Sequence, residues 1–130
     1  MRTKAYYELW TLDANGEITS IILTQDFRHI DFNVLASGIT TGFTLTVYKS
    51  DQLAIPDLSS AVSATNMYVP VQIVNKNNGA VIDGSTGIVL WANGLTSYEV
   101  NDNVARWIGI KMTARTDGQA FITMNLANNQ

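Results

Sequence analysis

The chain contains no cysteine. It therefore forms no disulfide, offers no thiolate to a metal ion and has no cysteine nucleophile. A protein without thiols is compatible with any redox environment, so this absence leaves the redox compartment open.

Charge is also scarce, because 15% of the residues are charged whereas an average domain has about a quarter. The formal net charge is -3 and the isoelectric point is about 4.8. A nucleic-acid partner requires a basic patch or stripe, and the 8 Lys and Arg residues are scattered along the chain. The sequence therefore predicts that this protein does not bind nucleic acid.

Long hydrophobic runs are missing as well. No apolar stretch approaches the ~20 residues that a membrane span needs. The basic N-terminus, Met1 to Lys4, is followed by Ala-Tyr-Tyr-Glu and not by the apolar segment of a secretory signal. We therefore expect no membrane partner, and we expect the protein to be made and folded in the cytosol.

What the chain does have is alternation, most clearly in residues 106–126, RWIGIKMTARTDGQAFITMNL. Two alternating runs flank a Thr-Asp-Gly, which predicts a β-hairpin with one buried face. Trp107 and Phe121 lie on the other face, and we expect both rings to pack beneath a second layer, either another sheet or a neighbouring subunit. The residues expected on the buried face are Ile108, Ile110, Met112, Ala114, Ala120, Ile122, Met124 and Leu126.

Similar short runs recur along the chain. Residues 4–12 are followed by Asp-Ala-Asn-Gly at residues 13–16, a strong turn signal, so residues 17–24 are expected to return as the second strand of another hairpin. In residues 28–34 and 42–49, apolar and polar residues alternate, as in strands of an antiparallel sheet with one face exposed to solvent. The remaining candidate strands are residues 68–74, where Pro70 indicates an edge or a bulge, and residues 80–82, 86–91 and 96–100.

This pattern predicts a single all-β domain over residues 1–130, an antiparallel β-sandwich of eight to ten short strands. Residues 50–66 are the longest stretch without a strand pattern. Asp57 is positioned to cap a short helical turn there. A loop of this length in a compact domain is usually functional or packed on its own.

Residues suited to catalysis are few, and we expect no enzyme. His29 is the single histidine, and its neighbours place it on the outer face of a strand. The sequence has no nucleophile-elbow motif. A pair of carboxylates that meet in space stays open, but most acidic residues lie in turns, where Asp is favoured for hydrogen bonding to the backbone.

Metal and cofactor sites are not expected either. Residues 13–17, Asp-Ala-Asn-Gly-Glu, begin like a calcium loop but lack its second half. This segment and Asn101-Asp102-Asn103 are interpreted as turns, and calcium binding there stays open. No phosphate-binding glycine motif occurs, and the sequence gives no reason to expect a small-molecule ligand.

Aromatic residues are the remaining signal. Trp and Tyr side chains serve both protein interfaces and sugar-binding surfaces. We expect Trp10 or Trp91 to lie in the core. Gly109 leaves room beside Trp107, which favours a packed indole.

The chain resembles small all-β structural proteins of tailed-phage virions, of the head decoration or auxiliary capsid type. The resemblance is carried by AYYELWTLDANGEI, TLTVYKSDQ with its Pro-Asp-Leu loop, VPVQIVNKNNGAVIDGSTGIV and SYEVNDNVARWIGIKMTARTDGQAFITMNL. It implies a jelly-roll or related sandwich and no catalysis. It also implies a place in the virion after manufacture in the host cytoplasm, with the major capsid protein as partner. Members of this class often form homo-oligomers.

The segments expected to contact neighbours are the aromatic N-terminal strand, residues 50–66 and the strands that carry the two outward rings. The candidate partner-contact residues are Tyr6, Tyr7, Trp10, Leu53, Ile55, Leu58, Trp107 and Phe121. The alternative is a carbohydrate-binding sandwich or a receptor-contacting appendage of the virion. It requires two or three exposed aromatic faces on one platform, with Asn, Asp or Arg beside them.

Overall fold

The structure is a computed structural model that describes residues 4–101 and 103–127, without the side chains of Lys4, Leu9 and Trp10. The described residues form eleven strands, one more than the upper end of the expected range. Their bounds are β1 (Lys4–Leu12), β2 (Ile22–Leu23), β3 (His29–Ser37), β4 (Phe43–Ser50), β5 (Val69–Pro70), β6 (Ile73–Asn75), β7 (Val81–Ile82), β8 (Ile88–Leu90), β9 (Gly94–Val100), β10 (Trp107–Arg115) and β11 (Gln119–Ala127).

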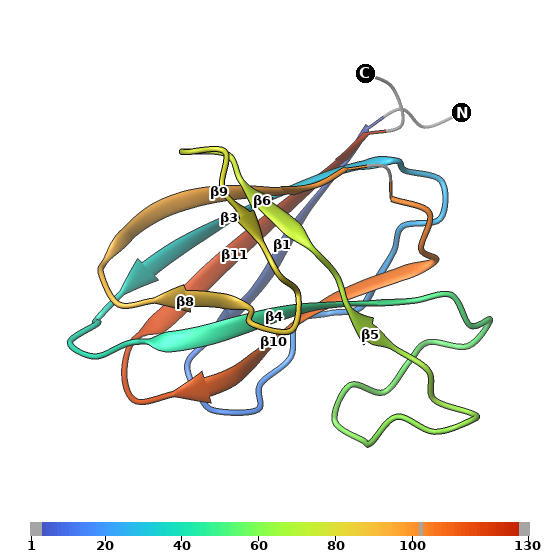
Figure 1. Cartoon of the computed structure of the whole chain (residues 1–130), viewed down its shortest axis with the longest axis horizontal. Coiled ribbons are helices and arrows are strands. Elements are labelled where there is room, and N and C mark those ends of the chain that lie inside the picture. The colour runs from blue at the N-terminus through green and yellow to red at the C-terminus, as the bar shows by residue number, and fades with distance from the viewer. Residues whose placement is uncertain (1–3, 102, 128–130) are drawn as a thin grey trace.

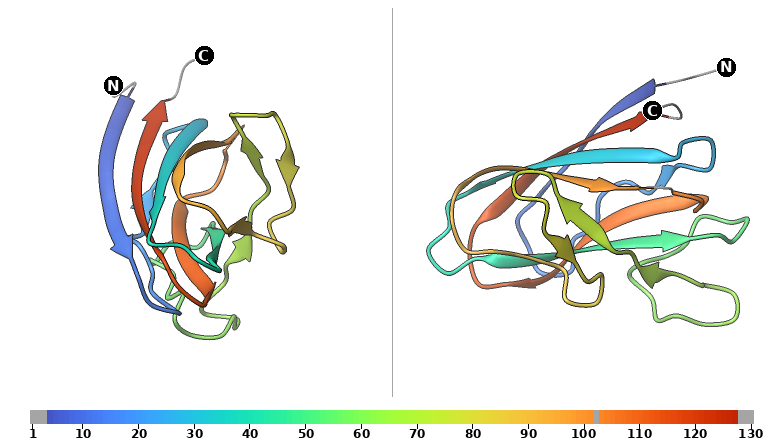
Figure 2. Two further views of the ribbon diagram at one scale, coloured as in Figure 1. Left: turned by 90° about the vertical axis from the view of Figure 1, so that its left-hand side faces the viewer. Right: turned by 45° about the horizontal axis from the view of Figure 1, so that its top comes forward.

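The strands build two antiparallel sheets that face each other (Figure 1). The six-stranded sheet has the order β1-β11-β3-β9-β6-β7, and the five-stranded sheet has the order β2-β10-β4-β5, with β8 also paired to β4. Figure 2 shows β1, β11 and β3 side by side in one curved layer. The prediction of an all-β antiparallel sandwich is confirmed.

The order of the strands is that of a jelly roll. Without β5, β6 and β7, the two sheets are β1-β11-β3-β9 and β2-β10-β4-β8, so consecutive strands alternate between the sheets as in a double Greek key. The three short strands are an insertion between β4 and β8. β5 extends one sheet, and β6 and β7 extend the other.

This topology corrects both predicted hairpins. β10 pairs with β2 and β4, whereas β11 pairs with β1 and β3, so the Thr-Asp-Gly at residues 116–118 connects two sheets and not two paired strands. β1 and β2 likewise lie in different sheets. Asp117 explains the first case, because its carboxylate accepts hydrogen bonds from the backbone N–H groups of Thr40, Thr41 and Gly42 in the connection between β3 and β4.

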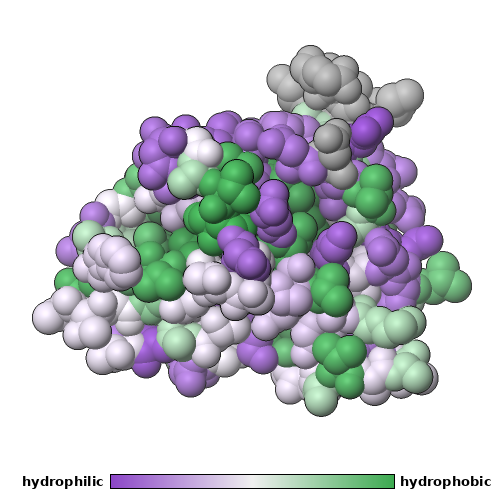
Figure 3. All heavy atoms as spheres, viewed as in Figure 1, coloured by the Kyte–Doolittle hydropathy of each residue, from purple (hydrophilic) through white to green (hydrophobic). Residues whose placement is uncertain are grey.

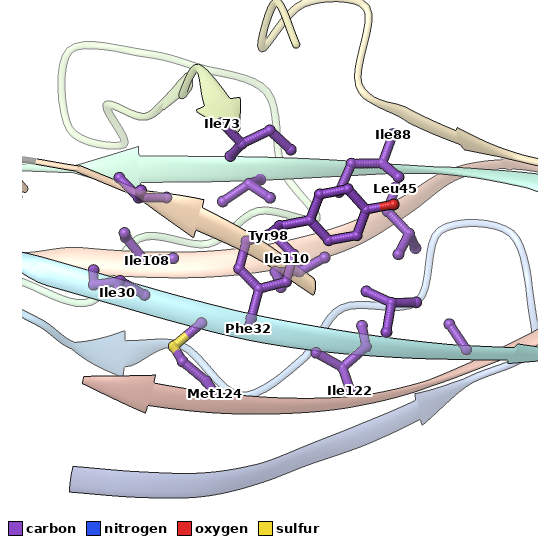
Figure 4. Packing of buried hydrophobic residues seen from close by; sticks show 14 of the residues in the cluster. Ile30, Phe32, Leu45, Ile73, Ile88, Tyr98, Ile108, Ile110, Ile122 and Met124 are labelled. Carbon is purple, nitrogen blue, oxygen red and sulfur yellow. The ribbon is translucent and has the colours of Figure 1, made fainter. Parts of the chain in front are cut away.

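The core fills the space between the two sheets, and its side chains are those that the alternation placed inward. Ile30, Phe32, Ile110, Met112 and Ile122 are fully enclosed, and Figure 4 shows most of this cluster pointing into one interior. Phe32 and Tyr98 stack with ring centroids 5.3 Å apart. Each large apolar side chain buried here contributes about 1.5–3 kcal/mol.

Some expectations about individual positions are wrong. Ala114 is exposed because a register shift between Met112 and Ala114 reverses the alternation of β10. Trp91 is 72% exposed and does not belong to the core. The side chain of Trp10 lies outside the described residues.

Residues 50–66 contain no helical turn. Asp57 instead accepts hydrogen bonds from the backbone and the hydroxyl of Ser59 and from the hydroxyl of Ser60. The expected strand at residues 68–74 is divided into β5 and β6, which join different sheets. Pro70 lies in β5, at the edge of its sheet as expected.

Candidate functional site

The two outer faces of the sandwich differ in what covers them. On β10, the space above Gly109 is filled by the side chains of Ile21 and Leu58, since an added Cβ would lie 2.5 Å from Ile21 Cδ1 and 3.0 Å from Leu58 Cδ1. Lys111 Nζ donates a hydrogen bond of 2.9 Å to the carbonyl oxygen of Leu58. The chain therefore covers this part of its five-stranded sheet with its own loop.

The same loop explains the position of Trp107. Its indole Nε1 donates a hydrogen bond of 2.9 Å to the carbonyl oxygen of Gln52, and the ring is partly buried. Tyr68 contacts Tyr48 edge-on, with ring centroids 5.1 Å apart, and its hydroxyl donates to Ser60. The ring of Trp107 therefore makes its contacts within the chain. The space above Gly109 holds the side chains of Ile21 and Leu58, and not the indole as expected.

The outer face of the six-stranded sheet carries an exposed apolar row. Leu35 of β3 is the direct partner of Phe121 on β11 and of Leu95 on β9. Leu95, Leu35 and Phe121 are 61%, 46% and 39% exposed. Three apolar side chains from three adjacent strands therefore form one continuous row that faces solvent.

A polar row runs parallel to the apolar row, two residues along the strands. Asn33 is in register with Ser97 and Thr123. The Ser97 hydroxyl donates to Asn33 Oδ1 at 2.6 Å, and Asn33 Nδ2 donates to Thr123 Oγ1 at 3.3 Å. These bonds link three strands next to the apolar row.

A third row contains the charged groups. Asp31 is in register with Glu99, and His29 lies two residues before Asp31 on the same face of β3. An open hollow of about 590 Å³ lies beside this row, lined in part by Tyr6, His29, Asp31 and Asn125. The outer face is therefore apolar at one end, polar in the middle and charged at the other end.

The candidate contact residues fall into three groups. Tyr6 and Phe121 lie on the outer face of the six-stranded sheet. Leu53 and Ile55 lie on the 50–66 loop and are 82% and 61% exposed. This loop lies at the lower right of Figure 1. Figure 3, in the same view, shows hydrophobic side chains among polar ones there. The other three candidates are covered by the chain itself. Tyr7 is half-buried against the core, Leu58 is 2% exposed, and Trp107 is partly buried.

Trp107 and Phe121 therefore lie on opposite sides of the sandwich, each on the outer face of its own sheet. Trp107 does pack under other residues, but these belong to the 50–66 loop of its own chain and not to the second sheet. Phe121 remains 39% exposed beside two other exposed apolar residues. No residue of the described chain covers Phe121, so a covering layer from a neighbouring subunit stays a prediction.

The site includes residues that the sequence analysis did not select. Leu35 and Leu95 are apolar residues at outward positions of β3 and β9, where the alternation of buried and exposed residues leads one to expect polar ones. Phe121 has the same position in β11. These three apolar residues at outward positions can be identified from the sequence. Their alignment in one row cannot, because it depends on which strands pair.

Carboxylates with shifted pKa values lie away from this face, in turns. Hydrogen bonds from the Ser59 hydroxyl and backbone hold the pKa of Asp57 below its ordinary value. The Ser85 backbone and hydroxyl lower the pKa of Asp83 in the same way. Glu17 accepts a hydrogen bond from the Asp13 backbone N–H, which lowers the pKa of Glu17 and closes residues 13–17 as a turn. These groups stabilise loops, in line with their interpretation as turn residues.

The described part of the chain contains no helix with the length and apolar character that crossing a membrane requires.

Together, the topology and the two outer faces define an all-β jelly roll with one exposed, graded sheet face. The crystal structure of the SPBc2 prophage-derived protein YomS is similar to this chain, with a TM-score of 0.60 and 11% sequence identity. The likeness covers 95% of this chain and 91% of that one, so the two share a fold over nearly their whole lengths. No protein-family model matches the chain, and no curated protein matches its sequence.

Proposed function

We propose that this chain is a non-enzymatic structural protein of a phage particle that binds another virion protein through the outer face of its six-stranded sheet. The observation that carries the proposal is the exposed row of Leu95, Leu35 and Phe121. The shared fold with a prophage-derived protein supports the phage setting.

The outer face of β10 differs from the outer face that β3, β9 and β11 form. The chain covers the apolar positions of β10 with its own loop, but leaves three apolar side chains in register on β3, β9 and β11 exposed. Contiguous exposed apolar surface bordered by polar residues is a feature of protein interaction sites. A polar and charged border beside an apolar centre is the usual composition of a protein interface.

In its specific form, the proposal is a capsid decoration or auxiliary protein whose partner is the major capsid protein. β1 supports a second contact of this kind. It is a nine-residue edge strand paired on one side only, to β11, and such an edge offers backbone groups to a neighbouring strand. An edge of this kind also suits a homo-oligomer.

The experiment is co-sedimentation of the purified protein with particles of the phage that encodes it, together with light scattering to measure the mass of the free protein. The proposal predicts that the protein pellets with the particles at a fixed ratio to the major capsid protein. A protein that stays in the supernatant at saturating particle concentration would contradict the proposal.

A carbohydrate-binding role is the second candidate, and one observation favours it. Tyr6 is 58% exposed beside the hollow that Asp31 and Asn125 also line. A ring next to polar side chains suits a sugar. However, Phe121 lies in the apolar row, about 13 Å along the strands from the position of Tyr6 at ~3.3 Å per residue. Binding on a glycan array that Tyr6→Ala abolishes would favour this role.

A further inference from the structure

His29, Asp31 and Glu99 form a compact cluster at the charged end of the outer face. Their ligand atoms all lie within 4.8 Å of one another. His29 Nε2 is 3.1 Å from Asp31 Oδ1 and 3.8 Å from Glu99 Oε2. Two adjacent strands therefore direct one imidazole nitrogen and two carboxylate oxygens toward a common point.

Each carboxylate is held in place through its other oxygen. Lys76 Nζ lies 3.2 Å from Asp31 Oδ2, and Asn101 Nδ2 donates a hydrogen bond of 3.0 Å to Glu99 Oε1. Asp31 Oδ1 and Glu99 Oε2 are left facing the imidazole. Outer contacts of this kind orient the ligands of metal sites.

Asp31 Oδ1 provides a second observation. This oxygen is buried and accepts no hydrogen bond within the described chain, although the Asp31 side chain as a whole is 28% exposed and His29 Nε2 lies 3.1 Å away. A buried carboxylate oxygen without a donor is unfavourable unless a positive charge compensates it. Lys76 contacts the other oxygen of the same group, so a cation held between Asp31 Oδ1 and His29 Nε2 would supply this compensation.

We propose that His29, Asp31 and Glu99 bind a divalent transition-metal ion, for which Zn²⁺ is the best-fitting choice. Zinc binds imidazole nitrogen and carboxylate oxygen at about 2.0–2.2 Å, so neighbouring ligands of a tetrahedral site lie about 3.3 Å apart. The measured separations of 3.1 and 3.8 Å lie on either side of this value. All the ligand atoms lie within 4.8 Å of one another, so the side chains have to move closer together to form a tetrahedral site.

The donor set also selects among metals. Calcium takes six to eight oxygen ligands, whereas this cluster offers two carboxylates and one nitrogen. Imidazole suits zinc, copper and nickel. Three protein ligands leave a fourth position for a water molecule or for a group of a bound partner. Two of the three ligands, His29 and Asp31, also line the open hollow at this end of the face.

The test is titration of Zn²⁺ into the full chain, prepared without an affinity tag, by isothermal calorimetry. The proposal predicts one site per chain, with binding at least tenfold weaker in His29→Ala and in Glu99→Gln. Thermal melting gives a second measurement, because an ion that binds only the folded state raises Tm. Zn²⁺ is expected to raise the Tm of the unsubstituted protein and to leave both variants nearly unchanged.

The matched control is Asp13→Asn, which removes a carboxylate at the opposite end of β1 from Tyr6 and should leave Zn²⁺ binding intact. Circular dichroism without metal shows whether each variant keeps its strands, and partly exposed His29 and Glu99 should be replaceable without unfolding. Absent binding, binding that survives His29→Ala, or Ca²⁺ binding as tight as Zn²⁺ binding overturns the proposal. None of these outcomes bears on particle binding, so the two proposals fail separately.

Discussion

Leu35 and Phe121 are direct partners on neighbouring antiparallel strands, and both side chains point away from the core. Cross-strand pairs of this type stabilise a sheet by roughly 0.2–1 kcal/mol. Leu95 extends the pair on the other side of Leu35. The pair therefore contributes to the sheet and still leaves 46% of Leu35 and 39% of Phe121 exposed to a neighbouring protein.

Gly42 is expected to be irreplaceable because a Cβ there would lie 1.9 Å from the carbonyl oxygen of Leu90. Gly16 is the matched control, since its φ is also positive, at 89° against 118°, but nothing lies within 4 Å of an added Cβ. Backbone strain alone costs about 1–2 kcal/mol, so Gly16→Ala should lose about that much. The steric overlap should cost Gly42→Ala at least ~2 kcal/mol more.

Urea unfolding of the two variants beside the unsubstituted protein measures this difference directly. Equal losses for Gly16→Ala and Gly42→Ala would show that the connection after β3 does not pack against β8 as described.

Asp117 should make stability depend on pH in the acid range. Desolvation opposes its charge, but hydrogen bonds from the backbone N–H groups of Thr40, Gly42 and Thr41 outweigh that effect and hold its pKa below the ordinary 3.8. A lowered folded-state pKa stabilises the protein fully above the unfolded value, and this contribution is lost as the pH falls through the folded value. Asp117→Asn should therefore have a lower Tm than the unsubstituted protein at pH 7.

The measurement is thermal melting from pH 7 to pH 2. The Tm difference between the two proteins should be largest above pH ~5, shrink as the pH falls through the unfolded value of 3.8, and be smallest below the folded-state pKa. A difference that stays constant across this range would show that Asp117 acts through its shape and not through its charge.

The sequence predicted which residues face inward but not which strands pair. Ile108, Ile110 and Met112 in β10, and Ala120 to Leu126 in β11, are buried in the predicted phase. Alternation identifies the buried face of a strand and contains no information about its neighbour. A three-residue connection is compatible both with a hairpin and with a crossing between sheets. The bonds from residues 40–42 to Asp117 distinguish the two, and they join segments about 75 residues apart.

The candidate site was predictable to a similar degree. The sequence placed His29 and Phe121 on outward faces, and it offered Tyr6 as a contact residue. It could not bring Glu99 beside Asp31, or Leu95 beside Leu35, because both pairs depend on β3 lying next to β9. The enclosure of Leu58 and Trp107 could not be predicted either, since it depends on how the 50–66 loop folds back over β10.

The central claim is that the outer face of the six-stranded sheet binds a virion protein, and co-sedimentation of two double variants tests it most directly. One variant combines Leu35→Ser with Phe121→Ser, and the control combines Leu53→Ser with Ile55→Ser, which removes exposed apolar side chains from the loop on the other side of the sandwich. The account predicts that the first variant stays folded and loses particle binding by at least tenfold, while the control binds like the unsubstituted protein. Retained binding by the first variant together with loss by the control would contradict the account and would assign the binding surface to the 50–66 loop.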